Sequence, residues 1–366
     1  MKLPVPVLVL TGFLGSGKTT LLKGLLRKPE FKGTAVIINE FGDVGLDDAL
    51  IEAADEEVVL LPSGCVCCAV RSDLVEAFNR LYAQWQGGNI PDLTRVIVET
   101  SGLADPAPIA HTLMSENDLF RIYQLDGVIA AVDCELVTGQ LERYAETAKQ
   151  IALADRIILT KTDRVESTQI ESVVARLRGV NPAAPIKSSV MGECPAEILT
   201  GLAAYEPAVA KHHASAWLSG DAYESSPLGE ALNRPEHGPV DRRDDDLAHT
   251  HTHGVISFAM VFERPLDGQK LSFAMELLRM THGEKLLRVK GIVAIAGEDL
   301  PFVVHGVQHM FYPPTTLESW PTHDRRSKFV FITQNLTRAD IDKVLRPLLD
   351  ESAIERKAFF TADGSL

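Results

Sequence analysis

The stretch Gly12–Thr19, with the sequence GFLGSGKT, lies between an apolar run, Val5–Leu10, and a segment with helical periodicity, Thr19–Arg27. Its Gly-x-x-x-x-Gly-Lys-Thr pattern is that of a P-loop. In a P-loop the glycines let backbone N–H groups close around phosphate oxygens, and the N-terminus of the following helix adds positive potential. The order strand, loop, helix therefore predicts a site for a nucleoside triphosphate.

The N-terminal part of the chain repeats this alternation of apolar strands and amphipathic helices, which is typical of a parallel sheet. Strands are expected over Val5–Leu10, Ala35–Asn39, Val58–Leu61, Arg95–Glu99, Gly127–Val132 and Arg156–Leu159. Helices are expected over Thr19–Arg27, Ser72–Gln84, Glu142–Ala152 and Gln169–Arg178. The expected fold class is α/β: a P-loop NTPase domain with a mostly parallel sheet, followed by a smaller C-terminal α+β domain.

The composition changes between residues 211 and 253, where Pro, Gly, Ser, Asp and His dominate. Such a stretch is typical of a polar linker. We therefore expect a P-loop domain over residues 1–210, a linker containing His and Asp over 211–253, and an α+β domain over 254–366. In this last part, strands are expected over Val255–Phe262, Lys285–Ala296, Pro301–Phe311 and Lys328–Thr333, with helices over Gly268–Met280 and from Arg338 until Pro347 ends or kinks the helix.

The charge balance narrows the classes of partner. The 366 residues include 36 basic and 50 acidic side chains, a formal net charge of −14, which argues against nucleic acid. The sequence has no run of about eighteen apolar residues, so no membrane span is expected. The short hydrophobic start leads into the P-loop and is expected to be a first strand rather than a signal peptide. Without such a signal, the five cysteines indicate reduced thiols in the cytoplasm.

Phosphate and magnesium chemistry is expected at three positions. Lys18 should reach the β- and γ-phosphates, and the Thr19 hydroxyl should ligate Mg²⁺. Glu99 ends an apolar strand and precedes a glycine turn, where P-loop enzymes place the acid that holds the Mg²⁺ shell, usually through water. An ordinary solvated strand end is the alternative. We assign the catalytic roles to Lys18, Thr19 and Glu99.

The sequence TKTD, Thr160–Asp163, closes the strand Arg156–Leu159. The Asp163 carboxylate can accept from guanine N1–H and N2–H₂, a pair of donors that adenine lacks, so it would select GTP. Lys161 would lay its stem along the base plane. GTPases usually have Asn where this chain has Thr160, and a plain polar turn is the alternative. The expected nucleotide-binding residues are Gly12, Gly15, Ser16, Gly17, Lys18, Thr19, Thr20, Lys161 and Asp163.

The stretch Asn39–Gly45 follows the second strand and combines polar residues with two glycines. This composition suits a loop that orders with the γ-phosphate and relaxes after hydrolysis. A static loop is the alternative.

Three of the five cysteines, Cys65, Cys67 and Cys68, fall within four positions. Two thiolates converge in either an extended or a helical backbone, and the third joins only with a turn. A closed zinc site needs four ligands, so this cluster indicates an open, exchangeable site, with Glu40 as the first candidate for an extra ligand. Thiolates favour Zn²⁺ over Mg²⁺ or Ca²⁺ and leave Co²⁺ and Fe²⁺ open. Buried structural thiols or a redox switch are the alternatives.

The linker carries a second group of metal-ligating side chains. His249, His251 and His253 alternate beside three aspartates and could collect metal weakly. A solvated spacer is the alternative. The isolated Cys134 and Cys194 are interpreted as packing residues.

These motifs occur in a fixed order: GFLGSGKTT at 12–20, NEFG at 39–42, GCVCC at 64–68, ETSG at 99–102 and TKTD at 160–163. The order resembles the CobW family of P-loop GTPase metallochaperones over nearly the whole chain. The resemblance implies a slow GTPase whose nucleotide state sets its metal affinity and whose client is a metalloprotein. It also implies that Cys65, Cys67 and Cys68 hold the transported ion, with Zn²⁺ expected and Co²⁺ as the alternative.

Other functions stay open at this point. The chain could be a zinc buffer or sensor with a structural nucleotide, or a nitrile-hydratase-type activator using iron or cobalt. A P-loop kinase or ATPase, in which Asp163 is incidental, would bind ATP and GTP equally. The oligomeric state is open as well, with a homo-oligomer among the alternatives.

Overall fold

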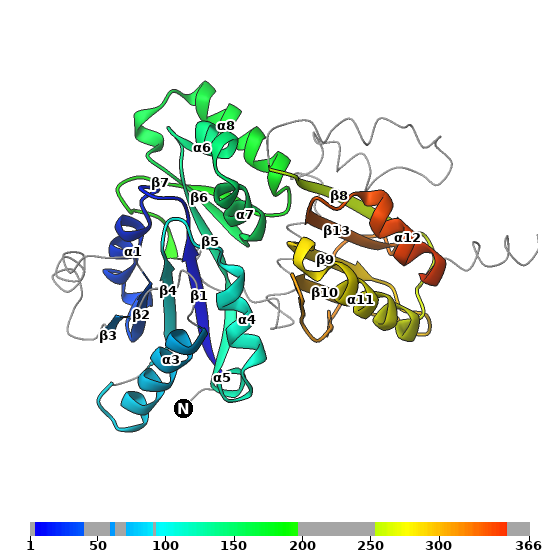
Figure 1. Cartoon of the computed structure of the whole chain (residues 1–366), viewed down its shortest axis with the longest axis horizontal. Helices are drawn as coiled ribbons and strands as arrows, with labels where there is room; N and C mark the ends of the chain where they lie inside the picture. The colour runs from blue at the N-terminus through cyan, green and yellow to red at the C-terminus, as the bar shows by residue number, and fades with distance from the viewer. Residues whose placement is uncertain (1–3, 40–58, 63–70, 91–92, 197–252, 350–366) are drawn as a thin grey trace, which may run out of the picture. The chain divides into compact units, whose positions relative to one another are not determined.

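The computed structural model describes residues 4–39, 59–62, 71–90, 93–196 and 253–349 (Figure 1). The chain divides into two compact units, Met1–Ala203 and Ala204–Leu366. The expected linker lies outside the described residues except for His253, and so do Glu40 and the Cys65–Cys68 cluster.

The first unit is built on a seven-stranded sheet in the order β3-β2-β4-β1-β5-β6-β7. Every strand pair of this sheet is parallel, which confirms the expected α/β class. The strands are β1 (Val5–Thr11), β2 (Thr34–Asn39), β3 (Val59–Pro62), β4 (Arg95–Thr100), β5 (Tyr123–Asp133), β6 (Arg156–Thr160) and β7 (Ile186–Ser189).

The centre of this sheet is buried on both faces, as the apolar strand sequences require. Leu8 and Leu10 of β1 share a core cluster with Leu21 and Leu25 of helix α1 (Lys18–Leu26). The alternate residue Val9 is equally buried and faces the opposite layer. The other α-helices in the described part of this unit are α3 (Arg71–Gln86), α4 (Ala107–Ser115), α5 (Asn117–Ile122), α6 (Val137–Arg143), α7 (Ala145–Leu153) and α8 (Ser167–Val180).

Five elements of the first unit, β7, α4, α5, α6 and α7, differ from the sequence-based expectation. Strand β7 was not expected, because its sequence, IKSS, is short and mostly polar. Helices α4 and α5 were not expected either. The single helix expected over Glu142–Ala152 is wrong: α6 and α7 are separate helices that meet at Tyr144, whose backbone is extended (φ −126°, ψ 116°).

The strand order places the functional loops together. From β1 the chain moves outward to β2 and β3, returns to β4, and continues past β1 to β5, β6 and β7. In such sheets, ligands bind at the carboxyl ends of the strands, where the direction of winding reverses. The P-loop, the Glu99 turn and the Thr160–Asp163 turn all leave this edge.

The second unit is an antiparallel sheet in the order β11-β10-β9-β13-β8, with β12 paired to β10. Its strands are β8 (Val255–Phe262), β9 (Arg288–Val293), β10 (Phe302–Val307), β11 (Met310–Phe311), β12 (Thr315–Thr316) and β13 (Ser327–Gln334). Helices α11 (Gly268–His282) and α12 (Arg338–Leu349) share one core cluster with Phe329 and Phe331 of β13. This arrangement confirms the expected α+β class.

Two details of the second unit correct the expectation. The strand expected over Pro301–Phe311 is wrong as one element, because the chain reverses between β10 and β11 at Gln308, which has a φ of 51°. Helix α12 runs two residues past Pro347, to Leu349, because Pro removes only one backbone donor so close to the helix end.

Candidate functional site

The P-loop connects the carboxyl end of β1 to the N-terminus of α1, as the sequence predicts. Gly15 has a φ of 72°, which favours glycine, and a Cβ atom built there meets nothing within 4 Å. Beside it, the Ser16 Oγ is buried and has no hydrogen-bond partner among the described residues. Open space next to a backbone loop and an available buried hydroxyl fit the phosphate chain of a nucleotide.

The Lys18 side chain is folded back onto this loop. Its Nζ donates to Gly12 O at 2.8 Å and to Phe13 O at 3.3 Å. The side chain is buried although it carries a charge. A buried ammonium held by carbonyl oxygens lies within reach of the phosphate position and can exchange these acceptors for phosphate oxygens.

Thr19 and Glu99 meet across the junction of α1 and β4. The Thr19 Oγ1 donates to Glu99 Oε1 at 2.9 Å, and Glu99 is 4% exposed. The register of β1 against β4 pairs Leu10 with Glu99, which fixes the carboxylate at the level where the P-loop begins. A hydroxyl and a carboxylate oxygen are the hard ligands that Mg²⁺ prefers, so the pair fits a magnesium site.

The turn after β6 lies beside the P-loop. Thr160 Oγ1 donates to Ser16 O at 2.7 Å and to Val132 O at 3.2 Å, so this residue ties β5, β6 and the P-loop backbone together. The threonine found where GTPases usually have asparagine therefore makes its own contact with the P-loop. Asp163 lies on an exposed 3₁₀ turn, Thr162–Arg164.

Lys161 is oriented by a residue that the sequence analysis missed, Asp133 at the end of β5. Its Oδ2 accepts from Lys161 Nζ at 2.6 Å, and its Oδ1 accepts from the N–H groups of Glu135 and Leu136. The Asp133 side chain is buried, whereas Lys161 is partly exposed. The signal available in the sequence was an acid directly after the apolar run Gly127–Val132.

The loop after β7 also lies at this edge. Ser189 pairs with Thr160 in the register of β6 and β7, which brings residues 190–193 beside the Thr160–Asp163 turn. A Cβ atom on Gly192 would lie 2.4 Å from Thr20 O, so this loop packs directly on α1. It was missed because β7 was missed.

The predicted metal ligands fall mostly outside the described residues. This is true of Glu40, Cys65, Cys67, Cys68, His249 and His251. In the sequence, the Cys65–Cys68 cluster begins three residues after the end of β3 and precedes α3. His253, which is described, accepts from Gln334 Nε2 through its backbone carbonyl at 3.3 Å.

The other two cysteines are structural. Cys134 and Cys194 are both buried, and burial raises the pKa of each thiol. Because the thiolate is the form that binds metal, a raised pKa makes both residues poor ligands. Within the described ranges, no three His, Cys, Asp or Glu side chains are grouped so that they could hold a metal ion.

A membrane-spanning helix is also missing from the described part of the chain: none of its helices is both long and apolar enough.

Comparison with known proteins agrees with this geometry. The zinc chaperone YjiA of Escherichia coli (strain K12) is 32% identical over 338 residues, which cover 92% of this chain and 96% of that protein. The zinc-regulated GTPase metalloprotein activator 1 of Saccharomyces cerevisiae is 27% identical, over 95% of this chain and 84% of its own length. The crystal structure of Zn(II)-bound YjiA GTPase from E. coli matches with a TM-score of 0.69 and 28% identity, over 95% of this chain and 99% of that chain.

Two family descriptions match separate parts of the sequence. Residues 6–188 match "CobW/HypB/UreG, nucleotide-binding domain", and residues 255–349 match "Cobalamin synthesis protein cobW C-terminal domain". The first match spans the parallel sheet and its nucleotide-site loops, and the second spans the antiparallel unit. The chain therefore belongs to the CobW family, with both the nucleotide-binding and the C-terminal domain of that family.

Proposed function

We propose that this protein is a GTP-hydrolysing metallochaperone that binds zinc at Cys65, Cys67 and Cys68 and delivers it to a client metalloprotein under nucleotide control. The observation that carries the proposal is the common edge of the parallel sheet. The P-loop, the Thr19–Glu99 pair and the Lys161–Asp163 turn leave this edge, and β3 ends there three residues before the first cysteine. The expected phosphate-sensitive loop follows β2 in the sequence and the thiol cluster follows β3, and the proposal is that these two segments influence each other.

The phosphate end of the site is assigned to Lys18, Thr19 and Glu99. Lys18 Nζ gives up the carbonyls of Gly12 and Phe13 and donates to the β- and γ-phosphates. Thr19 and Glu99 would hold Mg²⁺, which when bound neutralises the charge that develops on the transferred phosphoryl oxygens. Glu99 keeps the Thr19 hydroxyl oriented in the free protein, so these oxygens are positioned before nucleotide binds.

The base end is assigned to Lys161 and Asp163. The buried Asp133 carboxylate holds Lys161 Nζ, and the lysine stem would lie along the plane of the base. The exposed Asp163 carboxylate is available to both donors of guanine. This pairing favours GTP over ATP, because a carboxylate left without donors gains nothing from adenine.

The cargo is assigned from the chemistry of the cysteines and from the names of the relatives. The relatives are called zinc chaperones and zinc-regulated activators, and thiolates favour zinc over hard cations. Three thiolates with Glu40 as a fourth ligand would form a site that can open at one ligand. A site with one exchangeable ligand suits transfer to a client better than permanent storage. Cobalt is the second candidate for the cargo.

Single-turnover GTP hydrolysis, with and without equimolar Zn²⁺, tests this proposal. We expect the rate to depend on zinc in the full-length protein and to lose that dependence in Cys67→Ala. Cys194→Ala is the matched control, because it removes a buried thiol that is not part of the Cys65–Cys68 cluster and should keep the dependence. A wild-type rate that is the same at every zinc concentration would instead identify a zinc buffer with a structural nucleotide.

A further inference from the structure

Helix α7 contacts the loop between β4 and α4 through hydrogen bonds and an ion pair. Gln150 of α7 is fully buried, and its Nε2 donates to Gly102 O and to Ala104 O, both at 3.1 Å. Two carbonyl acceptors fix which end of the amide faces the loop, because only the NH₂ end can donate. The neighbouring Lys149 adds an ion pair with Asp105 at 3.6 Å. Two consecutive residues of α7 thus hold this loop, Gln150 through backbone carbonyls and Lys149 through the Asp105 side chain.

The same loop touches the P-loop. A Cβ atom on Gly102 would lie 2.5 Å from Leu14 N, so the two backbones are as close as glycine allows. The strand that leads into the loop carries Glu99, which is bonded to Thr19. The position of this loop is therefore set between the P-loop on one side and Gln150 on the other.

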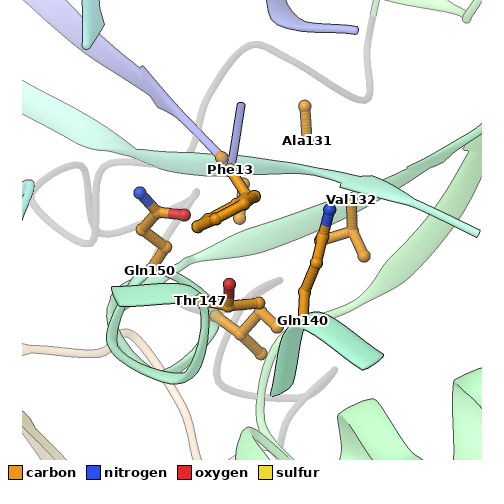
Figure 2. Close-up of a pocket in the computed structure, with 9 residues that line it drawn as sticks. Phe13, Ala131, Val132, Gln140, Thr147 and Gln150 are labelled. Carbon is orange, nitrogen blue, oxygen red and sulfur yellow. The ribbon is translucent and has the colours of Figure 1, made fainter. Parts of the chain in front are cut away.

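The Oε1 atom of the Gln150 amide faces a small cavity next to the P-loop. The cavity is lined by Gly12, Phe13, Gln140, Thr147 and Gln150, among others. Figure 2 shows the Gln150 oxygen directed toward the side of Phe13, and the Thr147 hydroxyl raised toward the same space. Gln150 Oε1 and Thr147 Oγ1 are both buried with no hydrogen-bond partner among the described residues. Two such oxygens lining one cavity fit an ordered water that bridges Thr147 and Gln150 of α7.

We propose that Gln150 is a positioning residue that holds the loop after β4 in register with the P-loop, so that the site distinguishes GTP from GDP. The inference rests on the proposed GTPase function. GDP would be held by the P-loop and by the Thr160–Asp163 turn. The Gln150 Nε2 group donates to Gly102 O and Ala104 O and to neither of these two segments. The γ-phosphate would extend from the P-loop toward the loop after β4. A change in the position of Gly102 would therefore alter the contacts of the γ-phosphate.

Gln150→Met tests this role, because methionine has a similar length and no donor. Loss of two hydrogen bonds is expected to lower kcat for GTP hydrolysis by about tenfold or more. The preference for a non-hydrolysable GTP analogue over GDP should fall by a similar factor, whereas GDP affinity should stay within about threefold, since the GDP contacts are untouched. Titration with fluorescent nucleotides and single-turnover kinetics give these values.

Two further variants keep the test decisive. Thr147→Val removes the hydroxyl of the same cavity but preserves its shape, and it should keep the wild-type preference for the GTP analogue. Gln150→Glu preserves the shape of residue 150, and its buried carboxyl group can donate at most one hydrogen bond to the two carbonyls, so it should reproduce the direction of the loss in a second variant if Gln150→Met folds poorly. A wild-type preference in both Gln150 variants, or an equal loss of GDP and GTP-analogue binding, would overturn the positioning role. A wild-type protein that does not hydrolyse GTP would overturn the proposed function, whereas the affinity ratio would still test Gln150.

Discussion

Replacing Lys18 with alanine is expected to lower the rate of GTP hydrolysis by about 10²–10³-fold, the usual cost of removing one preorganised donor from a charged transition state. Lys18 is the buried cation of the P-loop, and its Nζ lies 2.8 Å from Gly12 O at the start of the loop. The ammonium can therefore reach the phosphates without a large movement of the backbone. GTP affinity should fall as well, because the same donor contacts the ground-state phosphates.

The control for this variant is Lys23→Ala, which removes a lysine from the last turn of the same helix. Lys23 lies outside the phosphate loop, so its removal should leave hydrolysis unchanged. Thermal unfolding of both variants separates a lost contact from a lost fold, since Lys18→Ala also leaves buried carbonyls without their donor. Normal hydrolysis by a folded Lys18→Ala protein would contradict the assignment of this loop.

Replacing Asp163 with asparagine is expected to weaken GTP binding by about 100-fold and to create binding of xanthosine triphosphate. In the proposed site the Asp163 carboxylate would accept from two guanine donors, whereas an amide can satisfy only one of them. Xanthine has a carbonyl where guanine has an amino group, so the new NH₂ of asparagine gains an acceptor. Competition between the two nucleotides for wild-type and variant protein measures the switch.

Asp118→Asn makes the same chemical change on an exposed residue of α5, away from the turn after β6, and should leave the base preference unchanged. Unchanged GTP binding in Asp163→Asn would mean that this turn does not read the base. Equal ATP and GTP affinity in the wild-type protein would favour a kinase or an ATPase.

The parts of the fold that depend on local pattern could be predicted from the sequence. The apolar runs of β1, β4 and β6 are long and rich in Val, Ile and Leu, so the strands and the loops that follow them were expected within one or two residues of their observed ends. The pattern at Gly12–Thr19 carries its own conformation, because the positions of glycine and lysine determine the loop. Thr19 and Glu99 were both expected to serve magnesium, but their hydrogen bond depends on β4 lying beside β1, a strand order that the sequence analysis did not predict.

The parts that depend on tertiary contacts could not be predicted. Asp133 became part of the site only because β5 lies beside β6, which brings its carboxylate to Lys161. Gln150 lies in a helix whose sequence gives no sign that it faces the loop at Gly102. The interruption between α6 and α7 at Tyr144 also involves a tertiary contact. The ring centroids of Tyr144 and Phe13 lie 4.6 Å apart, and the helical periodicity of the sequence does not indicate this contact with the P-loop.

The central claim is that nucleotide state sets zinc affinity, and a zinc titration of the full-length protein tests it most directly. Zn²⁺ is titrated into protein loaded with a non-hydrolysable GTP analogue and into protein loaded with GDP, with Cys67→Ala and Cys194→Ala treated in parallel. The account predicts zinc binding tighter in the GTP-analogue state by about fivefold or more, a difference that Cys67→Ala loses and Cys194→Ala keeps. Equal zinc affinity in the two nucleotide states of the wild-type protein would contradict it.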